Sequence, residues 1–351
     1  MKENAIVLTG GMLDTSNAKT AHGLIRTSSR YNIIAVIDKN GAGSDAGEVL
    51  DKTNRNMPVY ASVADFLASG KAKAKYAVIG IALPGGVLPA EMVVDIKAAI
   101  TAGISVVSGL HRFLNDMQEL VKMAQQHNVS LVDIRKPRSK DQLKFWTGEI
   151  YNIPSKIIAV LGTDCALGKR TTACLITGAM QKAGVNAQMI FTGQTGWLQG
   201  HKYGFILDTT YNDFVSGELE NAVVTCYKET NAEVMFIEGQ SALSNPSGPC
   251  GAELLLSAHA KGVILQHAPE RIYFEGREEE KIEINLAREI GLIQLYGGKV
   301  LALTLNTHGL TRPQADEFKR LYQQQFNIPV ILPLEEGMEE LSGVIKNYMQ
   351  A

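Results

Sequence analysis

The chain has 351 residues, which is long enough for two domains. Its 45% hydrophobic and 20% charged residues are ordinary for a globular protein, and a formal net charge of -2 gives no electrostatic reason to expect nucleic acid or an anionic membrane as partner. Four cysteines without metal-site or disulfide spacing, and no uncharged apolar run of about 18 residues, favour a cytoplasmic enzyme-sized chain.

The first 135 residues alternate short apolar runs with helix-like segments. We expect strands at 4–11, 32–40, 76–83, 103–110 and 129–136. Helices are expected at 17–30, 62–69, 89–102 and 110–126. This alternation predicts a parallel sheet with helices on both faces.

Two loops of this half follow expected strands and contain paired glycines. Gly10 and Gly11 follow the first strand, Asp38 ends the second, and the loop 83–89 follows the third. The pattern G-x-G-x-x-G of dinucleotide-binding folds is absent, so we interpret these residues as turns and caps rather than as an NAD site.

A charged segment with two prolines, residues 136–156, separates a second series of strands and helices. We expect strands at 156–162, 186–193, 233–240, 261–268, 299–306 and 328–334, and helices at 169–183, 212–229, 249–259, 280–296, 311–325 and 335–349. The apolar runs are continuous rather than alternating, which is typical of strands buried on both faces. We therefore predict an α/β protein in which an N-terminal Rossmann-like parallel-sheet domain (1–135) and a linker (136–156) precede a larger P-loop NTPase-like α/β domain (157–351) with the main site.

The sequence "GTDCALGKRTT" (162–172) lies between an expected strand and an expected helix. Gly162 and Gly168 permit close approach of the backbone to a ligand, and Lys169 supplies a positive charge for phosphate oxygens. The loop is one residue longer than G-x-x-x-x-G-K, and Arg170 stands where a Ser or Thr hydroxyl would bind magnesium. We therefore expect phosphate binding here, without assuming ATP hydrolysis.

The loop resembles the "GTDTxxGK" loop of dethiobiotin synthetase and its relatives. "VMFIEGQ" is similar to their strand that ends in Glu-Gly, and "LALTLN" to a later strand that ends in Asn. This resemblance places Glu238 and Asn306 beside Lys169, with Asn306 able to contact an adenine edge. No metal site is expected, but Thr171 and Glu238 would be the ligands if magnesium is bound.

Four polar, glycine-rich stretches at or after strand ends complete the candidate site: 191–208, 209–223, 237–255 and 265–276. Such loops are where sites of α/β proteins are built. Together with "GTDCALGKRTT" they carry the run "GQTGWLQG … NDFVSGELE … IEGQSALSNPSGPCGAELLLS … KGVILQHAPERIYFEG", which resembles the D-glutamate N-acetyltransferase-like family over essentially the whole chain. That family was long catalogued only as a domain of unknown function.

The resemblance implies transfer of an acyl group, acetyl or succinyl, from an acyl-CoA to the amino group of an amino acid, with D- or L-glutamate as the leading acceptor. We infer that the loop holds the phosphates of CoA, through Gly162, Thr163, Asp164, Cys165, Gly168, Lys169, Arg170, Thr171, Thr172 and Asn306. We expect the acceptor to contact Gln194, Gln240, Ser241, Asn245, Ser247 and Arg271, of which Arg271 would pair with its side-chain carboxylate. We also expect a homo-oligomer without nucleic acid or membrane partners.

Acyl transfer to an amine needs a base, for which the candidates are His267, Glu238 and Asp213. The amides of 244–251 are candidates for the oxyanion hole, and Cys250 is an alternative acyl-carrying nucleophile.

Three other classes of function are also compatible with parts of the sequence. They are an ATP-dependent ligase or kinase of the dethiobiotin synthetase type, a nucleotide-binding regulator without turnover, and an NAD-dependent epimerase or dehydrogenase.

Overall fold

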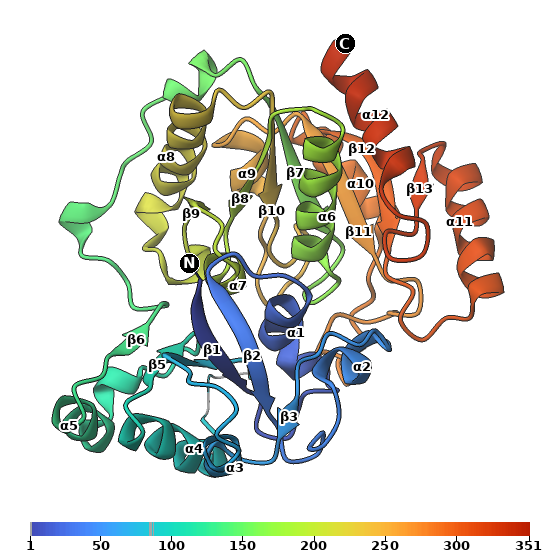
Figure 1. The fold of residues 1–351 in the computed structure, drawn as a ribbon. Helices are drawn as coiled ribbons and strands as arrows, with labels where there is room; N and C mark the ends of the chain where they lie inside the picture. Colours follow the sequence, from blue (N-terminus) through green and yellow to red (C-terminus); the bar gives the residue numbers. More distant parts are fainter. Residues whose placement is uncertain (1, 84–85, 87) are drawn as a thin grey trace. The chain divides into compact units, whose positions relative to one another are not determined.

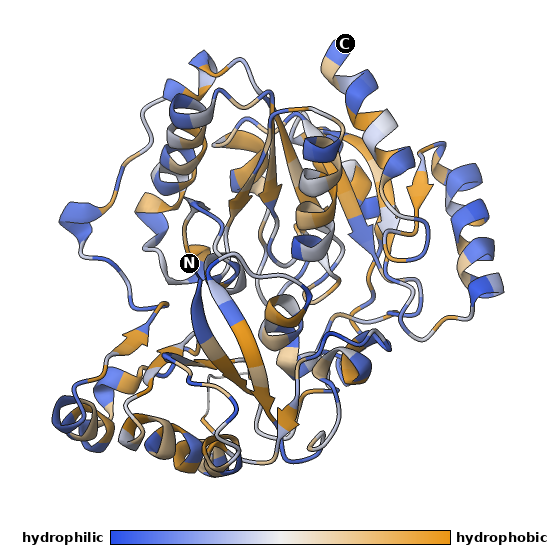
Figure 2. Ribbon diagram, in the orientation of Figure 1, coloured by the Kyte–Doolittle hydropathy of each residue, from blue (hydrophilic) through white to orange (hydrophobic). Residues whose placement is uncertain are grey.

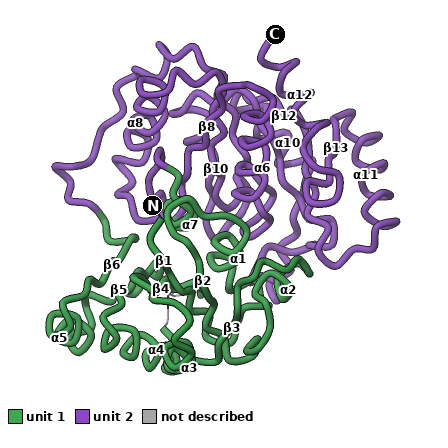
Figure 3. The backbone as a smooth tube through the Cα atoms, in the orientation of Figure 1, with its two compact units in different colours: residues 1–137, 194–201 green, residues 138–193, 202–351 purple. Residues whose placement is uncertain are grey.

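The computed structural model describes residues 2–83, 86 and 88–351. It divides into two compact units (Figure 3): residues 1–137 with Gln194–His201, and residues 138–193 with Lys202–Ala351. Residues 84, 85 and 87 of the loop 83–89 lie outside the described part. Within that part, no helix combines the length and the apolar character that crossing a membrane requires.

The first unit is built on a six-stranded parallel sheet in the order β3-β2-β1-β4-β5-β6. This is the strand order of a Rossmann fold, with a reversal between β1 and β4. The strands are β1 (Glu3–Leu8), β2 (Tyr31–Ile37), β3 (Val59–Tyr60), β4 (Tyr76–Ile79), β5 (Ser105–Ser108) and β6 (Leu131–Asp133). The helices are α1 (Lys19–Arg26), α2 (Ala46–Asp51), α3 (Val63–Ala68), α4 (Ala90–Thr101), α5 (Gln118–Gln126) and α7 (Gln194–Gln199).

Asp38, at the end of β2, holds turns together rather than facing an open site. Its carboxylate is 1% exposed and accepts hydrogen bonds from the Thr9 hydroxyl (2.6 Å) and the backbone N–H groups of Leu13, Asn40 and Gly41. Both carboxylate oxygens are thus engaged, which supports the interpretation of Asp38 as a turn residue rather than as a ribose-binding acid.

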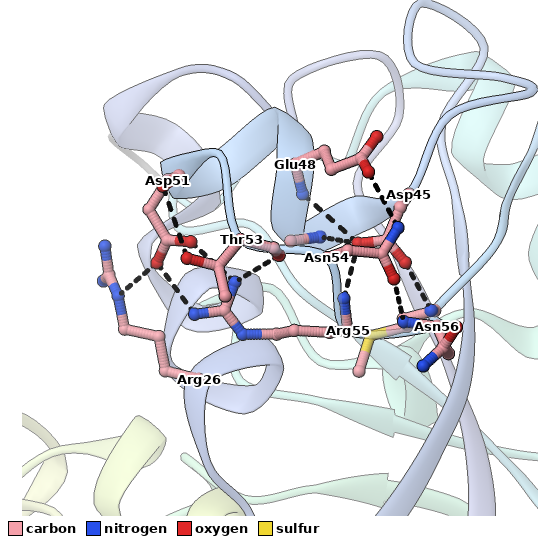
Figure 4. Close-up of polar contacts among 10 residues, drawn as sticks. Arg26, Asp45, Glu48, Asp51, Thr53, Asn54, Arg55 and Asn56 are labelled. Atoms are coloured by element: carbon pink, nitrogen blue, oxygen red, sulfur yellow. Dashed lines mark hydrogen bonds and ion pairs between the residues drawn. The ribbon is translucent and has the colours of Figure 1, made fainter.

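Helix α2 and the short strand β3 were not predicted from the sequence, and Asp45 explains why they form (Figure 4). Its carboxylate accepts hydrogen bonds from the backbone N–H groups of Gly47 and Glu48 at the start of α2, and of Arg55 and Met57 before β3. Burial alone would raise the pKa of Asp45, but these four donors lower it below its usual value. Helix α2 is thus stabilised by one capping aspartate and has no long apolar pattern by which it could be predicted.

Helix α7 groups with the first unit, although its residues were predicted to belong to the second domain. Gln199 is 5% exposed and donates to the backbone oxygens of Gly23 and Thr27, at the end of α1. The Arg30 guanidinium lies 3.9 Å from the centre of the Trp197 ring. The glycine-rich stretch 193–200 is therefore, in large part, a docking element of the first unit.

The second unit contains a seven-stranded parallel sheet in the order β13-β12-β11-β7-β10-β8-β9 (Figure 1). Its strands are β7 (Lys156–Gly162), β8 (Ala187–Phe191), β9 (Tyr203–Gly204), β10 (Val234–Glu238), β11 (Gly262–His267), β12 (Lys299–Leu305) and β13 (Val330–Ile331). Its helices are α6 (Lys169–Lys182), α8 (Asn212–Thr230), α9 (Ala252–Leu256), α10 (Leu286–Leu295), α11 (Arg312–Phe326) and α12 (Glu339–Gln350). The all-parallel pairing confirms the predicted α/β fold; β9 and α7 were not predicted.

Both faces of this sheet are buried, and most of its strand residues are hydrophobic (Figure 2). On one face, Val160 and Phe236 pack against helices α6 and α12, through residues such as Ile176 and Leu341. On the other face, alternate strand residues pack against α8, α9, α10 and α11. These two faces decide which site residues can meet.

The proline-containing segment before β7 is fixed to α8 by two buried glutamates. Glu218 accepts hydrogen bonds from the backbone N–H of Lys144 and from Arg138, and Glu220 accepts from the backbone N–H groups of Thr147 and Ile150. The segment has short 3-10 turns at Lys140–Gln142 and Glu149–Asn152.

Candidate active site

The loop between β7 and α6 has the backbone geometry of a phosphate-binding loop. Ala166 and Gly168 have φ of 50° and 102°, so the chain reverses hand twice before the helix begins at Lys169. A Cβ on Gly162 would lie 2.9 Å from Cδ of Lys169, so only glycine lets the lysine side chain fold back over the strand end. The glycines found in the sequence thus serve the loop and the position of Lys169.

The amides of this loop are unused donors. Among the described residues, the backbone N–H groups of 164–168 have no protein acceptor, whereas the N–H of Thr163 donates to Gln266 and that of Thr172 donates to Gly168. These amides precede a helix of 14 residues whose N-terminus carries a partial positive charge. Successive amides with alternating hand form a concave site for an anion.

Lys169 connects this loop to the loop that follows β10. Its side chain is 6% exposed, and its ammonium donates to the backbone oxygens of Asp164 (2.5 Å) and Ser241 (2.9 Å). Both acceptors are neutral carbonyls. The ammonium of Lys169 is thus held against the loop that carries the unused amides.

Asp164 and Arg271 brace the loop from behind. The buried Asp164 carboxylate accepts from Arg271 (3.0 Å), from the Asn245 amide (3.2 Å) and from the backbone N–H of Glu275 (2.7 Å). Arg271 also donates to the backbone oxygen of Cys165. In this structure the Arg271 side chain contacts the phosphate loop. From the sequence it was expected to pair with the side-chain carboxylate of the acceptor, which no contact in the structure tests.

The alternation of side chains along the strands separates two of the three candidate bases. In β10, Phe236 packs on the α6 face, so Glu238, two residues later, points to that face as well. In β11, Val263 and Leu265 pack on the opposite face, and His267 follows them there. Glu238 and His267 therefore lie on opposite faces of the sheet and do not serve one amine together.

Glu238 lies close to both cations at the start of α6. It is 6% exposed and accepts from the backbone N–H of Thr192 at 3.1 Å. Burial raises the pKa of Glu238 above its usual value, and the positive charges of Arg170 and Lys169 and the amides of Thr192 and Gly193 oppose this rise only in part. A carboxylate whose pKa is raised is a stronger base and is therefore better suited to take a proton.

His267 has the environment of a structural histidine. Its Nδ1 lies 2.8 Å from the Thr163 hydroxyl and its Nε2 lies 3.3 Å from the Tyr322 hydroxyl. Burial lowers the pKa of His267 from 6.5 to about 4, so the ring is neutral at pH 7. Both ring nitrogens are engaged with hydroxyls, which leaves neither for an acceptor amine.

The hydroxyl of Thr172 is also engaged. It donates to the side-chain oxygen of Gln266 at 2.6 Å, which also accepts from Thr304 at 2.7 Å. Thr171, the other hydroxyl considered for magnesium, is half-buried. Among the described residues, no three or more His, Cys, Asp or Glu side chains are grouped to hold a metal ion.

Asn306 lies next to the phosphate loop, as the resemblance implied, but it contacts the backbone. Its amide donates to the backbone oxygen of Leu167 at 3.1 Å, and its oxygen accepts from the N–H of His308. Cys165, the remaining loop residue of the predicted set, is a half-buried free thiol.

The segment 244–251 of the loop after β10 does not offer an oxyanion hole through its backbone. All the non-proline amides of 244–251 already donate, to Glu289, Ala242, Asn245 or Glu253. The predicted oxyanion hole in this segment is therefore not available. The buried Glu289 of α10, which was not recognised in the sequence, fixes the loop by accepting from the N–H groups of Leu243 and Ser244.

Cys250 is not built as a nucleophile. Its thiol donates to Glu253 at 2.7 Å, and burial, with the negative charge of Glu253, raises its pKa far above the usual value of a thiol. A protonated thiol is a poor nucleophile, because the thiolate is the reactive form.

The predicted acceptor residues fall into different surroundings. Gln240 lies at the site and donates to the Thr192 hydroxyl at 2.8 Å, whereas Asn245 is buried and accepts from Ser247. Ser241 has a left-handed φ of 30°, and its buried hydroxyl has no hydrogen-bond partner among the described residues. Such a group is uncommon and marks strain or a missing ligand.

Two other predicted residues have contacts that do not involve Lys169 or Glu238. Gln194 belongs to the first unit, where its side chain accepts from Arg135 at 2.7 Å. Asp213 is exposed in the first turn of α8, where its charge suits the helix N-terminus, and it makes no side-chain hydrogen bond or ion pair with any described residue. The structure thus brings together Lys169, Arg170, Glu238, Gln240 and Ser241.

Known proteins similar to this chain agree with the two-unit architecture. Residues 39–137 match the family described as "Domain of unknown function (DUF1611_N) Rossmann-like domain", and residues 144–342 match "Domain of unknown function (DUF1611_C) P-loop domain". The crystal structure of a DUF1611 family protein from Anabaena variabilis superimposes with a TM-score of 0.88 at 27% identity, covering 99% of this chain and all of the other.

Two curated relatives carry a functional name. A protein from Pseudoalteromonas sp named D-glutamate N-acetyltransferase is 31% identical over 281 residues, 78% of this chain and 82% of the relative. A protein of the same name from Tritonibacter scottomollicae is 26% identical over 276 residues, 77% of this chain and 80% of the relative.

Proposed function

The chain belongs to the DUF1611 family, and we propose that it is an acyl-CoA-dependent N-acyltransferase that acylates the amino group of an amino acid. The name of the two relatives supports an acetyl donor and D-glutamate as acceptor. Succinyl-CoA and L-glutamate are the alternatives to test. The structural observation that carries this proposal is a buried carboxyl, Glu238, placed beside an unused set of anion-binding amides.

The phosphate loop is proposed to hold the phosphates of CoA. The free amides of 164–168 and the ammonium of Lys169 form a site for a polyanion, and CoA carries a pyrophosphate and a 3′-phosphate. The proposed role of Asn306 is to keep Leu167 in place.

This arrangement requires the pantetheine arm of CoA to bend. Glu238 pairs with Val160 in the sheet, and Gly162 follows two residues later, so the Cα atoms of Glu238 and Gly162 lie about 8 Å apart. The arm between pyrophosphate and sulfur has the backbone length of about four residues, roughly 14 Å when extended. A thioester that reaches Glu238 from phosphates on the loop must therefore fold back.

A magnesium ion fits this site poorly. Arg170 occupies the position of the hydroxyl ligand in a magnesium-dependent loop, and its positive charge acts on Glu238. The Thr172 hydroxyl is engaged with Gln266. We therefore propose that the reaction uses no metal.

Glu238 is the proposed general base. The acceptor enters as an ammonium ion and gives one proton to Glu238, and the lone pair of the amine then attacks the thioester carbon. The C–N bond forms as the carbonyl becomes an oxyanion; the carbonyl then re-forms and the C–S bond breaks. The second proton passes from nitrogen to the CoA thiolate, and Glu238 returns its proton to solvent. One ammonium and one acyl-CoA thus yield one amide, one CoA thiol and one proton.

The oxyanion needs a donor other than the amides of 244–251. We assign this role to the hydroxyl of Ser241, which is buried without a partner three residues after the base. Gly248 lies beside this hydroxyl: a Cβ added to Gly248 would lie 3.9 Å from the Ser241 Oγ.

The experiment that tests this function is a CoA-release assay with acetyl-CoA or succinyl-CoA and a panel of D- and L-amino acids. Release of thiol together with an N-acyl amino acid is the expected result. Release of ADP from Mg-ATP with an amino acid present would instead support the ligase or kinase alternative, and tight nucleotide binding without any turnover would support a regulator.

A further inference from the structure

Arg170 and Lys169 are adjacent in sequence, but their side chains interact with different groups. The Nε of Arg170 is buried and has no hydrogen-bond partner among the described residues. Its charge acts on Glu238 and on Cys174, both on the α6 side of the sheet. Lys169, by contrast, donates to backbone oxygens of the phosphate loop and of Ser241.

Arg170 and Glu238 are close enough to interact but are not paired. In the part of the chain that the structure describes, no ion pair within 4.0 Å joins them. A buried donor without a partner costs stability, so its presence points to a group that binds there. Because Arg170 carries a positive charge, that group is an anion.

Gly193 places no side chain against Glu238 and Gln240. A Cβ on Gly193 would lie 3.4 Å from Oε1 of Glu238 and 3.2 Å from Nε2 of Gln240. Gly193 does not have a left-handed φ, so its lack of a side chain is not needed for the backbone. The space that it leaves adjoins the carboxylate and a side-chain amide.

We propose that Arg170 and Glu238 together bind the zwitterionic head group of the acceptor amino acid, with Arg170 on the α-carboxylate and Glu238 on the ammonium group. This inference rests on the proposed function, because it places the acceptor amine on the base. It removes Arg170 from the set of CoA-binding residues and separates the two adjacent cations: Lys169 binds the donor and Arg170 binds the acceptor.

The planar guanidinium of arginine suits this task, since it presents parallel N–H donors to a carboxylate. An amine that lacks the α-carboxylate leaves the guanidinium without its partner. The structure therefore predicts selection of α-amino acids over simple amines at this position.

The test is a binding titration without acyl donor, so that no turnover is needed. D-glutamate, L-glutamate, glutamine and 4-aminobutyrate, which is glutamate without its α-carboxylate, are titrated into the wild type and into Arg170→Gln, Arg170→Lys and Lys169→Met. Lys182→Gln is the matched control, because it removes a charge from the exposed end of the same helix. Affinity for CoA is measured in every variant. Retained CoA affinity reports correct folding of the Arg170 variants, and retained glutamate affinity reports it for Lys169→Met.

We expect Arg170→Gln to weaken glutamate and glutamine binding by about tenfold or more, and 4-aminobutyrate binding by less than about twofold. Arg170→Lys should recover part of the loss, and CoA affinity should not change in either variant. Lys169→Met should show the reverse pattern, and Lys182→Gln should behave as wild type.

Two results would overturn the inference. If Arg170→Gln weakens CoA but not glutamate, Arg170 is a phosphate ligand. If it abolishes only the preference for glutamate over glutamine, it contacts the side-chain carboxylate instead.

The proposed function can fail separately. Arg170-dependent amino-acid binding without CoA release by any acyl-CoA would preserve this inference and refute acyl transfer. CoA release with an acceptor preference unchanged by Arg170→Gln would do the opposite, and absence of both would refute both.

Discussion

Replacing Lys169 by methionine tests whether the phosphate loop holds the acyl donor. The aliphatic part of Lys169 packs over Gly162, and methionine retains most of that volume while removing the charge. The ammonium donates to the backbone oxygens of Asp164 and Ser241, which places its charge at the loop where a phosphate would bind. Loss of one charge-assisted contact is worth about 1.5–3 kcal/mol, which corresponds to roughly a tenfold to hundredfold weaker Kd for CoA.

The assay is a titration of CoA and of pantetheine, which has the arm but no phosphate. Lys169→Met should weaken CoA binding and leave pantetheine binding unchanged, and the effect on CoA should shrink at high salt. An unchanged Kd for CoA, or an equal loss for both ligands, would show that Lys169 does not hold the phosphates of the donor.

Three further outcomes are expected. Because burial raises the pKa of Glu238, kcat/KM should fall as pH falls through that raised pKa, and Glu238→Gln should lower kcat by about 10²–10⁴-fold with near-normal CoA affinity; a pH profile that keeps its acid limb in this variant would exclude Glu238 as the base. His267 has a pKa lowered from 6.5 to about 4, so it contributes stability above pH 6.5 that is lost as pH falls towards 4. His267→Asn should therefore reduce the loss of unfolding free energy between pH 7 and pH 4 by roughly 3 kcal/mol, as measured by urea unfolding at both pH values. An identical pH dependence in the variant and the wild type would refute the reasoning. Turnover should survive EDTA, since Arg170 replaces the hydroxyl ligand of magnesium; loss of activity that Mg²⁺ restores would show that Thr171 and Glu238 bind a metal.

The sequence predicts the second sheet well because its strands are continuous apolar runs bounded by glycine or charge. Strand β7 and helix α6 begin at the expected residues, since Gly162 and Gly168 define the loop between them. The missed elements are short: β3 and β9 have two residues each, and α2 depends on the capping carboxylate of Asp45. Two-residue strands form only because a neighbouring strand supplies their hydrogen bonds, which leaves no local pattern to read.

The candidate site was only partly predictable for a related reason. Lys169 and Glu238 follow from a strand–loop–helix pattern and from a strand end, and both can be located in one sequence. The sequence does not show which helices cover each face of the sheet, and therefore does not show which strand-end residues share a face. Glu238 and His267 were both candidates for the general base from the sequence, but they lie on opposite faces of the sheet.

Helix α7 shows the same limit. Gln194 and Gln199 have the composition of a polar site loop, yet in the structure they bind Arg135 and the end of α1 within the first unit. No local signal distinguishes a glutamine that binds a ligand from one that binds a neighbouring helix. Glu238, by contrast, must lie on the same face of the sheet as Phe236, because side chains two residues apart in a strand point to the same side.

The central claim is acyl transfer from an acyl-CoA to an amino acid at the Glu238 site. The most direct measurement follows CoA thiol release and N-acyl product together, for acetyl-CoA and succinyl-CoA with D- and L-glutamate, in wild type and in Glu238→Gln. The account predicts one thiol released for each N-acyl glutamate formed, without Mg-ATP, and a loss of both signals in the variant. Product formation that requires Mg-ATP, or no product with either donor and either enantiomer, would contradict it.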